Sequence, residues 1–131
     1  MTSIWIVDDD EEMSRAVSLF IRLMGCENTN FHSARAAAQA LMRGSRPDLL
    51  ILDISMPEVS GLDLLEFIRR REDWNTLPIL MLSSEAADVT VDQAMENGAD
   101  GYLTKPVTYE ELEAAVQRAL AKHQKGFQTH V

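Results

Sequence analysis

Three short runs of apolar residues recur along the chain with no polar residue inside them: Ile4–Val7, Leu49–Leu52 and Ile79–Leu82. Strands of a parallel sheet that is covered on both faces show this continuous pattern, whereas half-exposed strands alternate. Two weaker candidates, Asn28–Phe31 and Tyr102–Thr104, contain more polar residues. We therefore predict a sheet with the three apolar runs buried and the two polar ones at its edges or shallowly buried.

Segments with helical periodicity separate these strands: Glu12–Met24, Ser33–Arg43, Leu62–Arg71, Val89–Asn97 and Tyr109–Lys122. In the first segment we expect Ala16 and Val17 to face the core and Ser18 to face solvent. The spacings of Ser60 to Asp63 and of Thr108 to Glu111 predict capping boxes. Strict alternation of strands and helices predicts an α/β fold with a doubly wound parallel sheet and helices on both faces.

The totals narrow the class of protein. A length of 131 residues suits one domain, with residues 1–123 as the folded unit and 124–131 as a tail or linker stub. The net charge of −9 argues against direct nucleic-acid binding, which needs a basic surface. A single cysteine, Cys26, excludes an internal disulfide and favours a cytoplasmic setting. No apolar run approaches the ~20 residues of a membrane span.

Acidic residues follow the first strand directly: Asp8 to Glu12 are five consecutive carboxylates. In open α/β sheets, binding sites form outside the carboxyl ends of the strands. Side chains from four strand ends are therefore expected to converge: Asp8, Asp9, Asp53, Ser83 and Lys105. Each could instead be a turn former or a surface group, but their shared position at one end of the sheet argues for a site.

Carboxylates crowded at such an edge cannot all stay ionised unless a cation lies among them. Mg²⁺ is the natural choice, because it takes oxygen ligands and needs only one or two carboxylates. A divalent ion there would attract a phosphoryl group, whose oxygens Lys105 and the Ser83 hydroxyl could contact. Asp53 could then act as the nucleophile and form an acyl phosphate.

Four motifs resemble the response-regulator receiver domains of two-component signalling, of the chemotaxis-regulator type. They are Val7-Asp8-Asp9, Leu52-Asp53-Ile54-Ser55-Met56-Pro57, Leu82-Ser83-Ser84-Glu85 and Tyr102-Leu103-Thr104-Lys105-Pro106. Their order and spacing match the family over about residues 3–123. The resemblance implies a flavodoxin-like, five-stranded parallel sheet with the strand order 2-1-3-4-5.

The resemblance also implies roles at the predicted edge. Asp53 resembles the phospho-acceptor, which takes its phosphoryl group from the phosphohistidine of a sensor histidine kinase or phosphotransfer protein. Asp9 resembles a direct ligand of Mg²⁺, as does Asp53, and Asp8 resembles a neighbour that often acts through water. Ser55 resembles the residue whose backbone carbonyl completes the metal shell, although asparagine is frequent there.

Further residues resemble the family's switch. Ser83 matches the hydroxyl that bonds the phosphoryl group, and Lys105 the lysine that pairs with the acceptor and then with phosphoryl oxygens. Tyr102 matches the aromatic residue that turns inward on activation, and Pro106 a proline after a cis peptide bond. Two departures are Val107, where phenylalanine is frequent, and Glu85, which could affect the access of water.

The resemblance implies a signalling domain rather than an enzyme, acting as a monomer or an activation-dependent dimer. Its downstream protein partner would contact residues 89–97, 102–104 and 109–122. Three alternatives share parts of this pattern. A flavodoxin-like electron carrier would need a loop that accepts phosphate, and a haloacid-dehalogenase-like phosphatase would need an acid at Ser55. A degenerate receiver, acting only as a binding module, would usually lack Asp53, Asp9 or Lys105.

Several other residues are interpreted as having no part in a site. Arg69-Arg70-Arg71 is expected to be a solvated last helical turn. The three histidines, His32, His123 and His130, are expected at the surface. Trp74 is expected to cover a sheet edge. Five dispersed methionines are expected in the core: Met13, Met24, Met42, Met81 and Met95.

Overall fold

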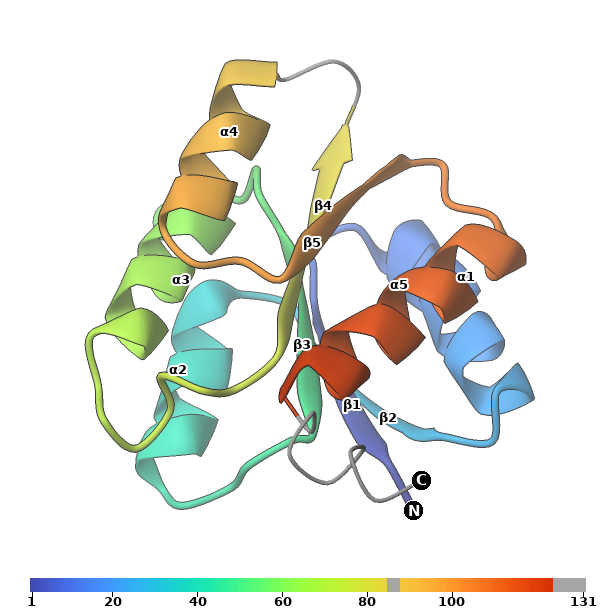
Figure 1. The fold of residues 1–131 in the computed structure, drawn as a ribbon, viewed down its shortest axis with the longest axis horizontal. Helices are drawn as coiled ribbons and strands as arrows, with labels where there is room; N and C mark the ends of the chain where they lie inside the picture. The colour runs from blue at the N-terminus through green and yellow to red at the C-terminus, as the bar shows by residue number, and fades with distance from the viewer. Residues whose placement is uncertain (85–87, 124–131) are drawn as a thin grey trace.

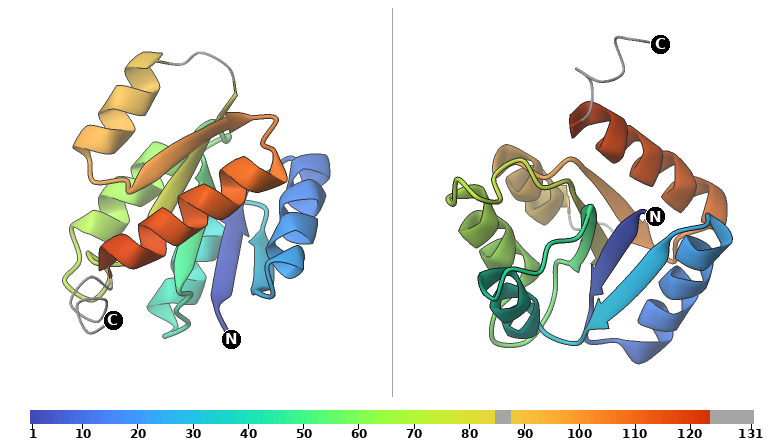
Figure 2. Two further views of the ribbon diagram at one scale, coloured as in Figure 1. Left: turned by 45° about the vertical axis from the view of Figure 1, so that its right-hand side comes forward. Right: turned by 90° about the horizontal axis from the view of Figure 1, so that it is seen from below.

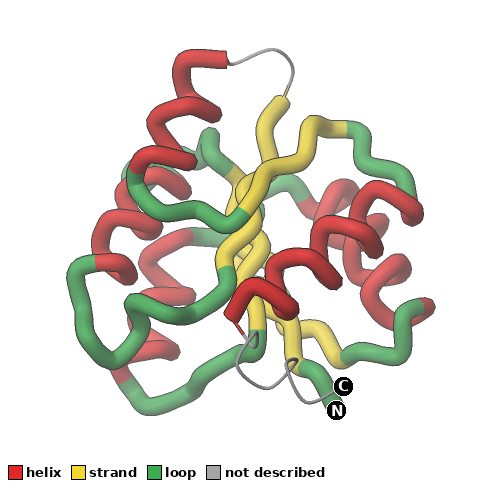
Figure 3. Tube along the Cα trace, viewed as in Figure 1, coloured by secondary structure: helices red, strands yellow, loops and turns green. Residues whose placement is uncertain are grey.

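Five parallel strands form one sheet at the centre of the molecule (Figures 1 and 3). The structure is a computed structural model that describes residues 1–84 and 88–123. The strands are β1 (Ser3–Val7), β2 (Glu27–Phe31), β3 (Leu49–Asp53), β4 (Ile79–Ser84) and β5 (Gly101–Lys105). Their order is β2-β1-β3-β4-β5. This order and the parallel arrangement confirm the predicted fold. Glu85, His130 and the predicted tail 124–131 lie outside the described residues.

Helices cover both faces of the sheet. They are α1 (Glu11–Leu23), α2 (Ala34–Met42), α3 (Gly61–Arg69), α4 (Asp88–Glu96) and α5 (Tyr109–His123). The layer of α1 and α5 lies on one face, and the layer of α2, α3 and α4 lies on the other (Figure 2). None of the helices in the described part of the chain is long and apolar enough to span a membrane.

The core is divided into two clusters by the sheet, because successive residues of a strand point to opposite faces. Trp5 and Val7 of β1 lie in the cluster under α2 and α3, whereas Ile4 and Ile6 lie in the cluster under α1 and α5. All five residues of β3 are buried, and β2 and β5 at the edges are partly exposed. The strands with continuous apolar runs are therefore buried, and the two more polar strands lie at the edges of the sheet, as predicted.

One face of α1 differs from the prediction. Ser18 is buried and Ala16 is exposed, because the inward seam of the helix includes Ser14, Val17, Ser18 and Ile21. The Ser18 hydroxyl and the side chains of Asn28 and Asn30 on β2 form hydrogen bonds of 3.0 to 3.2 Å with one another. These bonds compensate for burying polar groups, so a serine can occupy a buried position that was predicted to face solvent.

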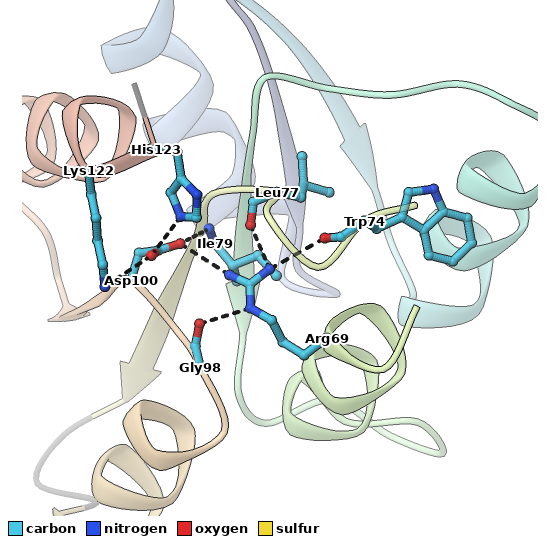
Figure 4. A network of polar contacts seen from close by, with 8 residues as sticks. All are labelled: Arg69, Trp74, Leu77, Ile79, Gly98, Asp100, Lys122 and His123. Atoms are coloured by element: carbon cyan, nitrogen blue, oxygen red, sulfur yellow. Dashed lines mark hydrogen bonds and ion pairs between the residues drawn. The ribbon is translucent and has the colours of Figure 1, made fainter. Parts of the chain in front are cut away.

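Arg69 is also placed differently from the prediction, because it lies in a buried polar cluster rather than in a solvated turn (Figure 4). Its guanidinium donates to the Leu77 and Gly98 carbonyls at 2.7 and 2.9 Å and to Asp100 Oδ2 at 3.1 Å. Asp100, whose side chain is 3% exposed, also accepts from the backbone N–H of Ile79 at 2.9 Å. The cluster thereby joins α3, the start of β4 and the loop before β5.

The last turn of α5 reaches the same cluster. His123 Nε2 lies 2.8 Å and Lys122 Nζ 3.3 Å from Asp100 Oδ1. His123 was expected to be a surface residue, but it is a partner of a buried carboxylate. The cluster lies at the amino ends of β4 and β5, which is the opposite edge of the sheet from the predicted site.

Other single residues also correct the prediction. Met81 is fully buried, but Met42 and Met95 are 64% and 40% exposed. Trp74 is a core residue, with its ring 5.6 Å from that of Phe67. The guanidinium of Arg71 lies 4.9 Å from the Trp74 ring, so this arginine covers an aromatic surface.

Candidate functional site

The carboxyl ends of β1, β3, β4 and β5 meet at one edge of the sheet. In the parallel pairing, Val7 lies opposite Leu52, Asp53 opposite Leu82, and Ser84 opposite Lys105. The register places the acids after β1, the acid that ends β3, and the lysine that ends β5 at the same edge of the sheet. The structure thus brings together residues that are up to 97 positions apart in the sequence.

Three carboxylates form the centre of this edge. Asp8, Asp9 and Asp53 each offer an oxygen atom, and these atoms lie within 4.8 Å of one another. Asp8 is fully buried, Asp53 is 3% exposed, and Asp9 is exposed. The nearby Asp10 is exposed, and its carboxylate caps α1 by accepting from the backbone N–H groups of Glu12 and Met13.

The backbone and its neighbours hold the Asp8 side chain in place. The backbone N–H of Asp8 donates to the Phe31 carbonyl at 3.0 Å, and Asp8 Oδ1 accepts from the Asp10 N–H at 2.9 Å. The other carboxylate oxygen, Oδ2, is buried and has no hydrogen-bond partner among the described residues, although it forms an ion pair with Lys105. A buried oxygen with spare acceptor capacity fits a cation ligand.

Lys105 supplies positive charge to the three acids. Its Nζ lies 3.2 Å from Asp8 Oδ2 and 3.3 Å from Asp53 Oδ1, and its side chain is 15% exposed. Burial lowers the pKa of Lys105, but the charges of Asp53 and Asp8 outweigh this effect and raise its pKa above the ordinary 10.5. The side chain is therefore an ammonium ion at neutral pH. The peptide bond from Lys105 to Pro106 is cis.

Asp53 is held between opposing influences. Burial raises the pKa of its carboxyl from the ordinary 3.8 to about 6, the charge of Asp8 adds to the rise, and the Lys105 ammonium opposes it. The group is still mostly ionised at pH 7, so it can act as a nucleophile, but its ionisation is costly. A divalent cation among the carboxylates would remove that cost. The donor set consists of hard oxygens, which fits Mg²⁺.

The loop from β3 to α3 passes directly beside Asp53. The backbone N–H of Ser55 donates to Asp53 Oδ1 at 3.3 Å, and the Gly61 N–H donates to the Ile54 carbonyl at 3.1 Å. Ser60 and Asp63 form the predicted capping box at the start of α3. Glu58 in this loop has a φ of 65°, a left-handed conformation that strains a residue with a side chain. The close approach of Gly61 to the Asp53 backbone was not anticipated from the sequence.

The remaining predicted residues lie along β4 and β5. Ser83 is 2% exposed and lies opposite Thr104 in the register. Tyr102, two residues before Thr104 on β5, is 50% exposed, so about half of this residue is accessible to solvent in this conformation. Val107 is partly buried and packs against the cluster under α1 and α5.

Comparison with known proteins identifies the family. The profile of the response regulator receiver domain matches residues 4–117, and the chain belongs to this family. Among solved structures, a response regulator from Chloroflexus aurantiacus superposes with a TM-score of 0.87 at 33% identity, covering 92% of this chain and 98% of that one. Chemotaxis protein CheY4 from Vibrio cholerae superposes with a TM-score of 0.81 at 30% identity, covering 91% and 98%.

The curated relatives differ in length. The transcriptional regulatory protein AfsQ1 of Streptomyces coelicolor is 31% identical over 130 residues, which are 95% of this chain and 54% of that protein. The chain thus spans about half the length of AfsQ1 and of the KdpE regulators that it also matches. Chemotaxis protein CheY of Pseudomonas aeruginosa is 32% identical over 88% of this chain and 93% of its own length. These findings favour a receiver over a phosphatase or an electron carrier.

Proposed function

We propose that residues 1–123 form a phospho-accepting receiver domain that takes a phosphoryl group onto Asp53. The observation that carries the proposal is the arrangement around this carboxylate. Asp53 is buried, has a pKa raised to about 6, contacts Lys105, and shares a cluster with Asp8 and Asp9. The donor would be the phosphohistidine of a sensor histidine kinase or a phosphotransfer protein, and the setting would be the cytoplasm.

In the proposed reaction, a carboxylate oxygen of Asp53 attacks the phosphorus atom in line with the phosphorus–nitrogen bond of the donor. A phosphorus–oxygen bond forms, the phosphorus–nitrogen bond breaks, and its electron pair and a proton remain with the imidazole. Lys105 then pairs with a phosphoryl oxygen in place of Asp53, and the Ser83 hydroxyl donates to another. Water later hydrolyses the acyl phosphate, so that Asp53 is restored.

Mg²⁺ would be held by Asp8, Asp9 and Asp53 together with the backbone carbonyl of Ser55, with water between Asp8 and the ion. When bound, it would neutralise charge on the phosphoryl oxygens. Asp8 and Asp53 share the Lys105 ammonium in the described structure, at 3.2 and 3.3 Å. That sharing leaves more negative than positive charge at the edge, which supports a site for a divalent cation.

The output would be a change at a protein-binding surface made by residues 89–97, 102–104 and 109–122. Movement of Ser83 toward the phosphoryl group would vacate space into which Tyr102 could turn. Because Tyr102 is 50% exposed, such a turn would change the surface that a partner meets. The net charge of −9 supports a protein partner and no direct nucleic-acid contact by this chain. The domain would act as a monomer or as an activation-dependent dimer.

Intact mass spectrometry tests the proposal. The protein is incubated with Mg²⁺ and phosphoramidate, whose phosphorus–nitrogen bond imitates that of phosphohistidine. We expect one added phosphoryl group on the wild type and on Asp92→Asn, an exposed control on α4, and none on Asp53→Asn. Equal labelling of Asp53→Asn would contradict the assignment. An unlabelled wild type would favour a receiver that acts only as a binding module.

A further inference from the structure

We propose that Gly61 is a positioning residue for the phospho-acceptor, because its lack of a side chain lets α3 begin directly against the Asp53 backbone. This inference rests on the proposed function of Asp53. It adds a requirement on a residue that would bind neither the metal nor the phosphoryl group. The reaction would depend on Gly61 through the orientation of the Asp53 carboxylate.

The space beside Gly61 is closed by backbone atoms. A Cβ atom added to Gly61 would overlap the carbonyl oxygen of Asp53, and it would lie 2.9 Å from the carbonyl carbon of Asp53 and 3.2 Å from Cα of Ile54. These atoms belong to the main chain at the end of β3, so no side-chain rotation can relieve the overlap. Either the strand end or the start of α3 would have to move.

Gly61 differs in this respect from other glycines of the chain. Gly25 and Gly44 follow helices with φ values of 83° and 101°, and a Cβ added to either would meet no described atom within 4 Å. At these two positions the left-handed backbone conformation after a helix accounts for the glycine. The φ of Gly61 lies outside the left-handed region, so a positive φ does not account for a glycine at this position. Gly61 is therefore explained by the close approach to Asp53.

Both sides of this contact are held by hydrogen bonds. On the strand side, the Ile54 N–H donates to the Leu82 carbonyl of β4 at 2.9 Å. On the helix side, the Gly61 N–H donates to the Ile54 carbonyl at 3.1 Å, and the capping box of Ser60 and Asp63 orders the first turn of α3. A methyl group between them would push on the Asp53 peptide group itself.

A shifted Asp53 peptide would change the site in two ways. The Asp53 carboxylate would turn relative to Lys105 and Asp8, and the Ser55 backbone, which donates to Asp53 Oδ1 at 3.3 Å, would move with it. Both the proposed metal ligands and the line of attack on phosphorus would be affected. Misplacement of a reacting group by about 1 Å can cost on the order of 100-fold in rate.

The test compares Gly61→Ala with Gly44→Ala and the wild type. Gly44→Ala is a matched control, because it strains a left-handed glycine in the loop before β3, at the other end of that strand from Asp53. Circular dichroism first establishes conditions in which each variant is folded. We then measure the rate of phosphorylation by phosphoramidate and, by calorimetry, the affinity for Mg²⁺. We expect Gly61→Ala to lose at least about tenfold in rate and to bind Mg²⁺ more weakly. We expect Gly44→Ala to have a lower melting temperature than the wild type but the same phosphorylation rate and the same affinity for Mg²⁺.

If Gly61→Ala is partly unfolded, all three proteins are measured in trimethylamine N-oxide, which favours the folded state. A rate and a Mg²⁺ affinity of Gly61→Ala within twofold of the wild type would overturn the inference and leave the proposed function intact. A wild type that accepts no phosphoryl group would refute the proposed function and this inference with it.

Discussion

Replacing Asp53 by asparagine should stabilise the metal-free protein, although it removes the proposed acceptor. Asparagine keeps the shape of the side chain and has no charge to bury. In the wild type, burial and the charge of Asp8 raise the pKa of Asp53 from 3.8 to about 6 against the opposing effect of Lys105. Ionisation of this group is therefore less favourable in the folded protein than in the unfolded chain, and the difference is a cost to folding.

The magnitude follows from the two pKa values, 3.8 and about 6. They differ by about 2 pH units, which at 1.36 kcal/mol per unit corresponds to about 3 kcal/mol at high pH. Below pH 3.8 the group is protonated in both states and the cost is absent. It grows as the pH rises through about 6, since over that range the folded protein holds the proton more tightly. The expected advantage of Asp53→Asn is about 3 kcal/mol at pH 8 and roughly half of that at pH 5.

Urea denaturation of both proteins in EDTA, in steps from pH 5 to pH 8, measures this advantage. Asp92→Asn, on the exposed surface of α4, controls for the loss of one negative charge and should show little change. A gain for Asp53→Asn that is independent of pH would show that the carboxylate is not strained by its surroundings. A loss of stability at pH 8 would refute the electrostatic reasoning.

Three further predictions concern other residues. Asp9→Ala should leave the metal-free protein as stable as the wild type or more so. It should also abolish the rise in melting temperature with Mg²⁺, which in the wild type reflects a stabilisation of about 2.7 kcal/mol at 100 times the Kd. A rise that persists in the variant would contradict the ligand assignment. Asp100→Ala should lower the free energy of unfolding, measured by urea denaturation, by about 3 kcal/mol, because it leaves the buried Arg69 guanidinium unpaired. A loss as small as that of the exposed control Asp92→Ala would show that the cluster contributes little to stability. Glu58→Gly should raise the free energy of unfolding by about 0.5–1 kcal/mol by relieving the left-handed φ of 65°, whereas Glu58→Ala should give no such gain.

The fold could be predicted from the sequence because its signals are local and repeated. Continuous apolar runs indicated the three central strands, and polar content indicated the edge positions of β2 and β5. The parallel order then brought Asp8, Asp53 and Lys105 to one edge, since the carboxyl ends of parallel strands lie together. Residue types at strand ends were therefore enough to locate the candidate site.

Contacts between distant segments were decided by the tertiary structure alone. Arg69 pairs with Asp100, 31 positions away, and Ser18 bonds to Asn28 and Asn30 on β2. Both departures arise because a buried polar group needs a partner that helical periodicity cannot indicate. The raised pKa of Asp53 and the closeness of Gly61 to its backbone likewise depend on burial and spacing in three dimensions. The sequence by itself determined which residues gather at the sheet edge, while packing decided their charge state and how closely the main chain surrounds them.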